Sequence, residues 1–365
     1  MDSTIKRNVI PSSRDKIDSV IELINSIGIN VHIISMSCVQ ESIFKFYRGS
    51  DSVIKEGICL KLFPSWGGNT KIIRWARIVW HIIAMFFYLL LHTKKNEPII
   101  VYHSQGYWGI ISLAKKIKKF RLILEVEEIY QDVKKSKIKI IDKLEYMDIN
   151  SADAFIFPTE ILNNKINPNH KPYAIIHGRY TESSIIADKF SDGKIHVVYA
   201  GTFDPNKGGA IAAIEAVEFL PSNYHIHICG FGTDEDTNFV KNKIQKISAR
   251  SNALVTFDGL KKGREYTMFI QQCHIGLSTQ NPSGNFNDTS FPSKILSYIS
   301  NGLSVVSIDI PVVRTSAVAK YITFYNKQTP RLIADAIMKT PLRLDYLNCF
   351  KELSYSFTES FKKLL

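Results

Sequence analysis

The sequence predicts an α/β protein made of two doubly wound, Rossmann-like domains that face each other across a cleft. Short apolar strands alternate with amphipathic helices along the chain, which is typical of parallel sheets covered by helices. The alternation breaks around residues 171–179 and then starts again. We therefore place an N-terminal, acceptor-binding domain at 1–178 and a C-terminal, donor-binding domain at 179–342. A helix in 343–365 is expected to pack back on the first domain.

Length and composition limit the class of protein. The chain has 365 residues, enough for two domains with their own cores, and 45% of them are apolar. Its five cysteines are scattered without a Cys-x-x-Cys pair. This pattern favours a reducing compartment and argues against a disulfide framework and against a zinc site. The first residues lack the apolar stretch of a signal peptide, so we expect a cytoplasmic protein.

The net charge of +12 predicts an anionic partner. Anionic lipid, an anionic substrate and nucleic acid all fit a basic surface. Nucleic acid ranks last, because the chain has no zinc-finger, RNP or helix-turn-helix pattern. We therefore expect an anionic membrane surface or an anionic substrate, and no nucleic acid.

The N-terminal domain begins with a regular alternation of elements. We expect helices at 17–27, 71–92 and 110–119, and strands at 31–35, 98–103, 121–126 and 154–157. The segment between 36 and 70 is expected to be irregular.

The helix at 71–92 has two possible environments. Its polar residues share one narrow stripe: Arg74, Arg77, His81, Tyr88 and His92. The uninterrupted apolar run, 82–91, is shorter than the roughly 20 residues of a membrane span. A wide apolar face with Trp75 and Trp80 indicates a helix lying in a membrane surface. The alternative is a helix buried in the core of the domain.

Acidic residues crowd the end of the strand at 121–126, where Glu125 is followed by Glu127 and Glu128. Carboxylates that lie close together raise one another's pKa, and such crowding is typical of functional sites. Glu127 is our candidate for the base that activates an acceptor hydroxyl, with Glu128 and His103 beside it on the acceptor side. The alternatives are that the acids pair with the basic clusters near Lys115 and Lys134, and that His103 is structural.

The C-terminal domain repeats the alternation more clearly. We expect strands at 195–200, 224–229, 254–257, 274–277, 304–308 and 321–325, with helices at 210–219, after Asp234, and at 262–273 and 331–338.

Residues 287–302 combine a polar loop with the start of a helix that stops at Gly302. The N-cap side is expected at one of the two residues before Pro292, which fits the first turn of the helix. The free N–H groups of Ser293 and Lys294, together with the lysine charge, would form an anion site. The alternative is an ordinary capped helix that binds nothing.

Three segments in this domain carry a resemblance: 199–209 (YAGTFDPNKGG), 228–232 (ICGFG) and 289–302 (TSFPSKILSYISNG). Together they resemble the donor domain of family 4 glycosyltransferases, which have the GT-B fold, and most closely those of bacterial capsular, exopolysaccharide and O-antigen synthesis. The resemblance implies a retaining enzyme with a nucleoside-diphosphate sugar donor and no metal or other cofactor. It also implies a lipid-linked saccharide acceptor and a peripheral location on the inner face of the cell membrane.

The resemblance also implies roles for individual residues. Lys207 corresponds to the family's diphosphate ligand and would stabilise the leaving group, although it also fits a solvated loop lysine. Thr202 follows Gly201 where the family has arginine, and Glu127 stands where the family often has histidine. The family's two glutamates fall on Thr289 and Ser297. The remaining donor-binding candidates are Gly230, Ser290, Phe291, Ser293 and Lys294.

These observations predict a retaining glycosyltransferase of cell-surface polysaccharide synthesis. The missing arginine and glutamates leave a second hypothesis, a non-catalytic GT-B scaffold or partner subunit at the membrane surface. A sugar-nucleotide epimerase is a third.

Overall fold

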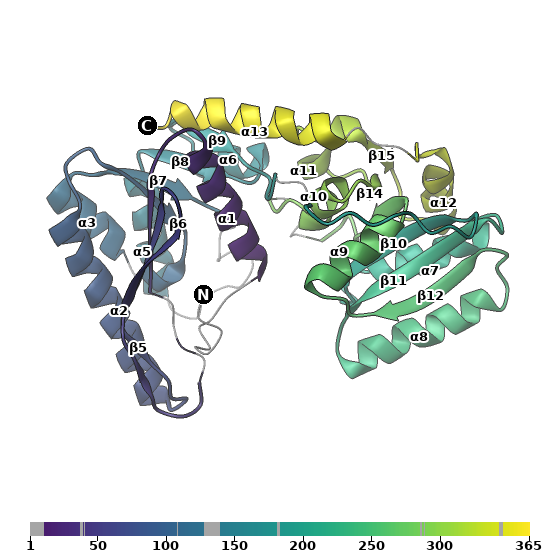
Figure 1. Cartoon of the computed structure of the whole chain (residues 1–365), viewed down its shortest axis with the longest axis horizontal. Coiled ribbons are helices and arrows are strands. Elements are labelled where there is room, and N and C mark those ends of the chain that lie inside the picture. Colours follow the sequence, from purple (N-terminus) through teal and green to yellow (C-terminus); the bar gives the residue numbers. More distant parts are fainter. Residues whose placement is uncertain are drawn as a thin grey trace. The chain divides into compact units, whose positions relative to one another are not determined.

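The computed structural model describes residues 11–36, 39, 41–107, 109–127, 139–180, 183–284, 287, 289–342 and 346–365 (Figure 1). The chain divides into two compact units. The first comprises Met1–Pro158, Asn163–Ile176 and Phe357–Leu365, and the second comprises Thr159–Leu162 and His177–Ser356.

The second unit contains a single six-stranded sheet in the described part of the chain. Its strands are β10 (Ile195–Thr202), β11 (Tyr224–Phe231), β12 (Leu254–Gly259), β13 (Ile275–Ser278), β14 (Ser304–Ile308) and β15 (Ile322–Tyr325). All neighbours are parallel and the order is β12-β11-β10-β13-β14-β15. This is the doubly wound order, in which the direction of winding reverses between β10 and β13. The predicted α/β architecture is confirmed.

Helices connect these strands. They are α7 (Gly209–Ala216), η2 (Val217–Phe219), α8 (Asp234–Ser248), α9 (Gly263–Gln272), α10 (Ser293–Ser300), α11 (Pro311–Arg314), η4 (Ala319–Tyr321) and α12 (Pro330–Lys339). The helices α8 and α12 both pack against α7. The central strands are therefore buried, and they read as continuous apolar runs such as Val197–Val198, which have no exposed surface.

Three sheets are formed by the described residues of the first unit. The largest has the parallel strands β6 (Pro98–Tyr102), β7 (Arg121–Glu125), β8 (Ala154–Phe157) and β9 (Tyr173–Ile175), in that order. A second sheet has the order β1-β4-β3, from β1 (Val31–Ser35), β3 (Ser50–Lys55) and β4 (Ile58–Leu62). The short strands β2 (Phe46–Tyr47) and β5 (Ser65–Trp66) form the third.

The expectation of an irregular segment between 36 and 70 is wrong. Strands β3 and β4 form an antiparallel hairpin, and the turn between them contains Gly57 at φ 76°. A positive φ is readily adopted by glycine, so the turn that closes this hairpin has a local cause.

The helices of the first unit are α1 (Pro11–Ser26), α2 (Lys71–His92), η1 (Gln105–Tyr107), α3 (Ile110–Lys118), α5 (Lys139–Ser151) and α6 (Glu160–Ile166). Two helices are divided between the units. The first three residues of α6 belong to the second unit, as does the terminal helix α13 (Tyr346–Lys362) up to Ser356.

Helix α2 has the bounds that the sequence predicted, and its packed side mixes polar and apolar residues, since His81, Met85 and Leu89 are buried. Within the stripe of polar residues, His81 is buried, and the Arg77 Nη1 donates to the Trp66 carbonyl at 2.8 Å. Apolar side chains are exposed instead: Ile72, Trp75, Val79, Trp80, Ile83, Phe87 and Leu91. The structure therefore packs one side of α2 and leaves most of its apolar surface exposed. In the described part of the chain, α2 is also the one helix that by length and composition is able to cross a membrane.

Candidate functional site

The predicted donor-binding residues lie at the carboxyl edge of the six-stranded sheet. Gly201 and Thr202 end β10, Gly230 lies near the end of β11, and the segment after β13 leads into α10. In doubly wound sheets, ligands bind outside the carboxyl ends of the strands where the winding reverses. The order of strands places that point between β10 and β13, next to these residues.

The loop after β10 is a compact turn built on Asp204. Its carboxylate accepts from the Asn206 N–H at 2.8 Å, and its carbonyl accepts from the N–H groups of Lys207 and Gly208 at 3.1 and 3.0 Å. The carbonyl of Lys207 accepts in turn from the Asn281 N–H at 2.7 Å. This loop is therefore fastened to the segment after β13, while the Lys207 side chain is exposed.

Two glycines allow the ends of β10 and β11 to approach closely. A Cβ on Gly230 would lie 1.8 Å from the Gly201 carbonyl oxygen, and the φ of Gly230 is 152°. No other residue fits this position without moving the backbone. Gly230 is thus required by the geometry of this edge.

Lys294 points back from α10 to the end of β10. Its Nζ lies 4.3 Å from the centre of the Tyr199 ring and 3.1 Å from the place of a Cβ on Gly201. Burial, and next the charge of Lys207, lower the pKa of Lys294 to about 8. The charge of Lys207 thus disfavours the charged form of Lys294, a repulsion that a bound anion would relieve.

Helix α10 begins later than the sequence suggested. The N-cap is Pro292, not Ser290 or Phe291, and it has no side-chain cap bond. Ser293 and Lys294 are therefore the first two helical residues, where backbone N–H groups have no partner within the helix. The predicted C-terminal stop is confirmed: Gly302 has φ 74°, and the N–H groups of Gly302 and Leu303 bond the carbonyls of Ile299 and Tyr298 at 3.0 Å.

The positions where the resemblance led us to expect acids have structural partners. Thr289 is buried and its carbonyl accepts from the Thr159 hydroxyl at 3.0 Å. The Ser297 hydroxyl lies 3.2 Å from that of Tyr266. The Phe291 ring stacks on His177 with centroids 4.8 Å apart, and Ser290 is half-buried. Their roles toward a donor stay predictions.

Tyr298 is a residue whose role the sequence did not indicate. Its hydroxyl accepts from the Ala200 N–H of β10 at 2.8 Å and lies 3.4 Å from the Leu277 carbonyl of β13. A Cβ on Gly276 would lie 2.3 Å from the Tyr298 ring. The side chain is thus inserted between the two strands at the point where the winding reverses. An aromatic residue opposite a glycine far away in sequence gives no local signal.

A pocket of about 420 Å³ borders the other side of the loop after β10. It is lined by residues that include Phe203, Asp204, Gly208 and Phe239. Neither Lys207 nor Lys294 is part of its lining, so it is separate from the predicted phosphate site.

In the first unit, Glu127 forms an ion pair with Lys16 of α1. The Lys16 Nζ also lies 3.8 Å from the Glu125 Oε1, and both of these side chains are buried. Burial raises the pKa of Glu125 to about 7, against the opposing effect of Lys16. The alternative, pairing with a basic side chain, holds for Glu125 and Glu127, but the partner is Lys16, while the Nζ of Lys115 bonds the Asp153 carboxylate at 2.6 Å.

Of the other two acceptor-side candidates, the structure describes His103 but not Glu128. His103 is buried after β6, with its Nε2 3.3 Å from the Glu145 Oε1. Glu128 lies outside the described residues, as do Lys134 and Asp288. The structure therefore brings Glu125 and Glu127 together around Lys16 and places His103 in a separate buried pair.

Comparisons with known proteins show a similarity of structure only. No family model matches the chain, and no curated protein matches its sequence. Among solved structures, an E. coli trehalose-6-phosphate protein bound with UDP-2-fluoro glucose is similar at a TM-score of 0.64, with 10% identity over 98% of this chain and 97% of that chain. A UDP-forming α,α-trehalose-phosphate synthase from Burkholderia vietnamiensis has a TM-score of 0.62 at 10% identity, over 97% and 96% of the two chains.

A trehalose-6-phosphate synthase studied with bisubstrate glycomimetics, for glycosyl transfer with retention, is similar at a TM-score of 0.63, with 10% identity over 98% of this chain and 97% of that chain. Each similarity extends over nearly the full length of this chain and of the chain compared with it. At such low identity a structural match shows the fold and not the reaction. The chain has the two-domain α/β architecture of the GT-B fold.

Proposed function

We propose that the protein is a retaining glycosyltransferase that uses a nucleoside-diphosphate sugar. The observation that carries the proposal is that the loop after β10, which holds Lys207, and the start of α10, which holds Lys294, both follow strands that meet where the sheet reverses its winding. The Lys207 carbonyl accepts from the Asn281 N–H after β13, and the Lys294 Nζ reaches back to Gly201 of β10. Two cations and two free helix N–H groups suit a diphosphate.

Two further findings support this function. The three segments that resemble family 4 glycosyltransferases all lie at the carboxyl edge of the second unit's sheet or lead away from it. Similar structures have been studied with UDP-2-fluoro glucose and for transfer with retention. We infer the same class of donor and the same stereochemistry for this chain.

The site suggests how the donor would be cleaved. Negative charge grows on the diphosphate as the sugar leaves, and Lys207, Lys294 and the Ser293 N–H would stabilise it. The acceptor hydroxyl would attack from the face that the diphosphate leaves. A divalent metal has no role in the transfer that we propose.

We assign the acceptor side to the first unit. Glu127 is the candidate for positioning or deprotonating the acceptor hydroxyl, with its charge balanced by Lys16. The exposed apolar face of α2, next to the exposed bases Lys71 and Arg74, suits an anionic membrane surface. A lipid-linked saccharide at the inner face of the cell membrane is therefore the proposed acceptor. Synthesis of capsule, exopolysaccharide or O-antigen is the role that this implies.

Replacing Lys207 by alanine tests the proposal. We expect turnover to fall by about 10²–10³-fold, because one group that stabilises the leaving diphosphate is lost. Nucleoside diphosphate released from a panel of UDP- and GDP-sugars is the readout, with a short lipid-linked saccharide as acceptor. Lys246→Ala is the matched control, since Lys246 is an exposed lysine on α8 of the same unit. Turnover of Lys207→Ala close to that of the control would refute the assignment.

One observation favours a second function, a non-catalytic subunit that keeps the fold. Thr289 and Ser297 stand where acids were expected, and both are engaged in contacts within the unit. Thermal unfolding with UDP and GDP separates the two functions, because a ligand that binds only the folded state raises the melting temperature. A higher melting temperature with UDP or GDP favours the enzyme, and no shift with any nucleotide favours the subunit.

A further inference from the structure

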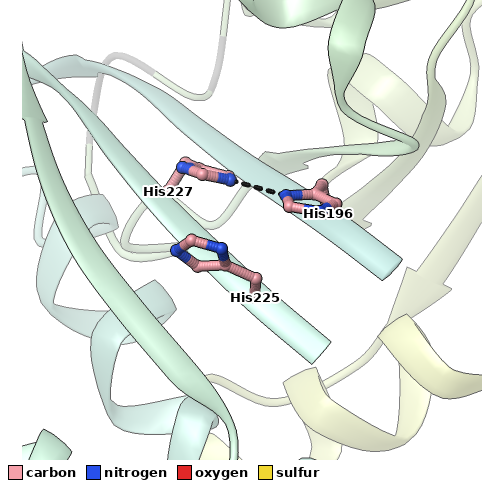
Figure 2. Close-up of side chains that lie close together, drawn as sticks. All are labelled: His196, His225 and His227. Carbon is pink, nitrogen blue, oxygen red and sulfur yellow. Dashed lines mark hydrogen bonds between the residues drawn. The ribbon is translucent and has the colours of Figure 1, made fainter. Parts of the chain in front are cut away.

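Three histidines meet on one face of the second unit's sheet, away from the donor edge (Figure 2). His196 of β10 is in register with His225 of β11, and His227 follows two residues later on the same face. One ring nitrogen from each lies within 4.8 Å of the others. His196 and His227 are buried, and His225 is half-buried.

The outer nitrogens of two rings face carboxylates. The Nε2 of His196 lies 2.8 Å from the Asp192 Oδ1, and the Nδ1 of His227 lies 3.2 Å from the Asp258 Oδ2. An ionised carboxylate only accepts hydrogen bonds. We assign a proton to the Nε2 of His196 and to the Nδ1 of His227. The other neighbour of that Nδ1, the Thr256 Oγ1 at 3.2 Å, has its own hydrogen directed at Asp258. Each neutral ring then keeps a lone pair on its other nitrogen.

The third ring is oriented by a hydroxyl. Thr256 donates its hydroxyl hydrogen to Asp258 at 2.8 Å, so its oxygen is left as the acceptor for the His225 Nε2 at 3.0 Å. The lone pair of His225 is then on Nδ1. All three imidazoles thus have one nitrogen held by an outer partner and one nitrogen available as a ligand.

This arrangement brings two acceptors into contact. The Nδ1 of His196 and the Nε2 of His227 lie 2.9 Å apart, along the dashed line in Figure 2. Two lone pairs at that distance repel, so a cation is needed between them. Either an extra proton or a metal ion would satisfy both nitrogens.

We infer that His196, His225 and His227 bind a divalent transition metal, with zinc as the best fit. Imidazole ligands suit zinc, nickel, copper and iron, and do not suit magnesium or calcium. Histidine ligands that donate their second N–H to a carboxylate are the usual arrangement around zinc. The two carboxylates, Asp192 and Asp258, also balance the charge of the ion. Zn–N bonds of about 2.0–2.1 Å place tetrahedral ligands about 3.3 Å apart, so the closest pair needs to open by only about 0.4 Å.

The site is structural and separate from the donor edge. Gly201 follows His196 by five positions on β10, about 16 Å along an extended strand. The metal would join β10 to β11, and through Asp258 it would also fasten β12. Its effect is therefore expected on the stability of the second unit.

The test uses the tag-free full chain after treatment with a chelator. One equivalent of ZnCl₂ should bind per chain and raise the melting temperature by mass action, whereas MgCl₂ should do neither. CoCl₂ in place of zinc should give the visible absorption of a four-coordinate ion. Wild-type chain that binds no zinc and shows no shift would overturn the inference, since a shared proton would then occupy the pair.

Variants locate the site. His225→Gln should lose the zinc-dependent shift, while His32→Gln, which changes an exposed histidine on β1, should keep it. Asp192→Asn should fold, because the side chain is 48% exposed, and should weaken zinc binding by about 10–100-fold through loss of the outer hydrogen bond. Zinc binding at wild-type strength by both His225→Gln and Asp192→Asn would place the metal elsewhere and refute the site.

Discussion

Lys294 is a cation in a position that favours its neutral amine. Burial and the nearby charge of Lys207 lower its pKa to about 8, while its Nζ rests against the Tyr199 ring. A diphosphate bound to both lysines would reverse this effect and raise the pKa, because an opposite charge favours the protonated form. The residue is therefore sensitive to both pH and donor.

Donor binding should weaken as the pH rises through 8. One pH unit above its pKa, only about a tenth of Lys294 is protonated in the free protein, so the affinity for UDP or GDP should be about tenfold lower near pH 9 than near pH 7. Calorimetric titration at several pH values measures this. Lys294→Arg should bind with little dependence on pH over this range, because arginine stays charged. Equal pH dependence in the two proteins would contradict the assignment.

The stability of the free protein should change in the opposite direction. An unfolded lysine has a pKa of about 10.4, so between about pH 8 and pH 10 the unfolded chain binds more protons at Lys294 than the folded chain does. The free energy of unfolding therefore gains a contribution from this residue as the pH rises. Below about pH 8 both states are protonated and the contribution is constant.

Gly230 should not tolerate a side chain. An alanine Cβ would meet the Gly201 carbonyl oxygen at 1.8 Å, so the ends of β10 and β11 would have to separate. We expect Gly230→Ala to lower the free energy of unfolding by about 3 kcal/mol or more and to abolish nucleotide binding. Urea unfolding measures the loss. Gly263→Ala is the control: it has positive φ but no atom within 4 Å of the Cβ, so it should cost about 1–2 kcal/mol. Similar losses of unfolding free energy in both variants would mean that alanine is excluded at Gly230 by the positive φ and not by the close approach to the Gly201 carbonyl.

At the scale of elements, α2 is distinguished by the side that it exposes. Arg77 and His81 face its own unit, whereas Ile83 is 46% exposed, Phe87 54% and Leu91 75%. Exposed apolar residues at a spacing of four form a continuous stripe on a helix. Such a stripe is an unusual surface in water and a good fit to the boundary of a lipid layer.

Two substitutions on this stripe should reduce binding to membranes. The double variant Ile83→Gln, Phe87→Gln should lose most binding to vesicles that contain anionic lipid, because about half of each side chain is available for burial in lipid. Co-sedimentation with vesicles measures the bound fraction. Ile186→Gln is the control, since Ile186 is 91% exposed in the second unit and should not affect binding. Undiminished binding of the double variant would exclude α2 as the membrane contact.

At the scale of the whole molecule, the elements of the second unit were predictable because each depends on local signals. Apolar runs such as 195–200 and 304–308 indicated strands, and the glycine at 302 indicated the end of α10. Their order in the sheet was not predictable from local signals. Strand pairing joins residues that lie far apart in sequence, as β10 and β13 do.

The same limit applies to the sites. Lys294 stood out because the start of a helix has a general physical meaning, and Lys207 stood out through the family resemblance. The pairing of Lys16 with Glu127 and the meeting of His196 with His225 depend on tertiary structure over more than 25 residues. No spacing rule for metal ligands covers histidines on neighbouring parallel strands.

Tyr298 links the proposed phosphate site to the stability of the sheet, two properties that an engineer would wish to vary separately. It belongs to the helix whose start is the proposed phosphate site, and its hydroxyl also replaces a backbone partner between β10 and β13. A library that randomises α10 to change the donor sugar would therefore lose folded protein wherever Tyr298, or Gly276 beneath its ring, is altered. Diversity is better placed at Thr289, Ser290 and Ser297, with Tyr298 and Gly276 held constant.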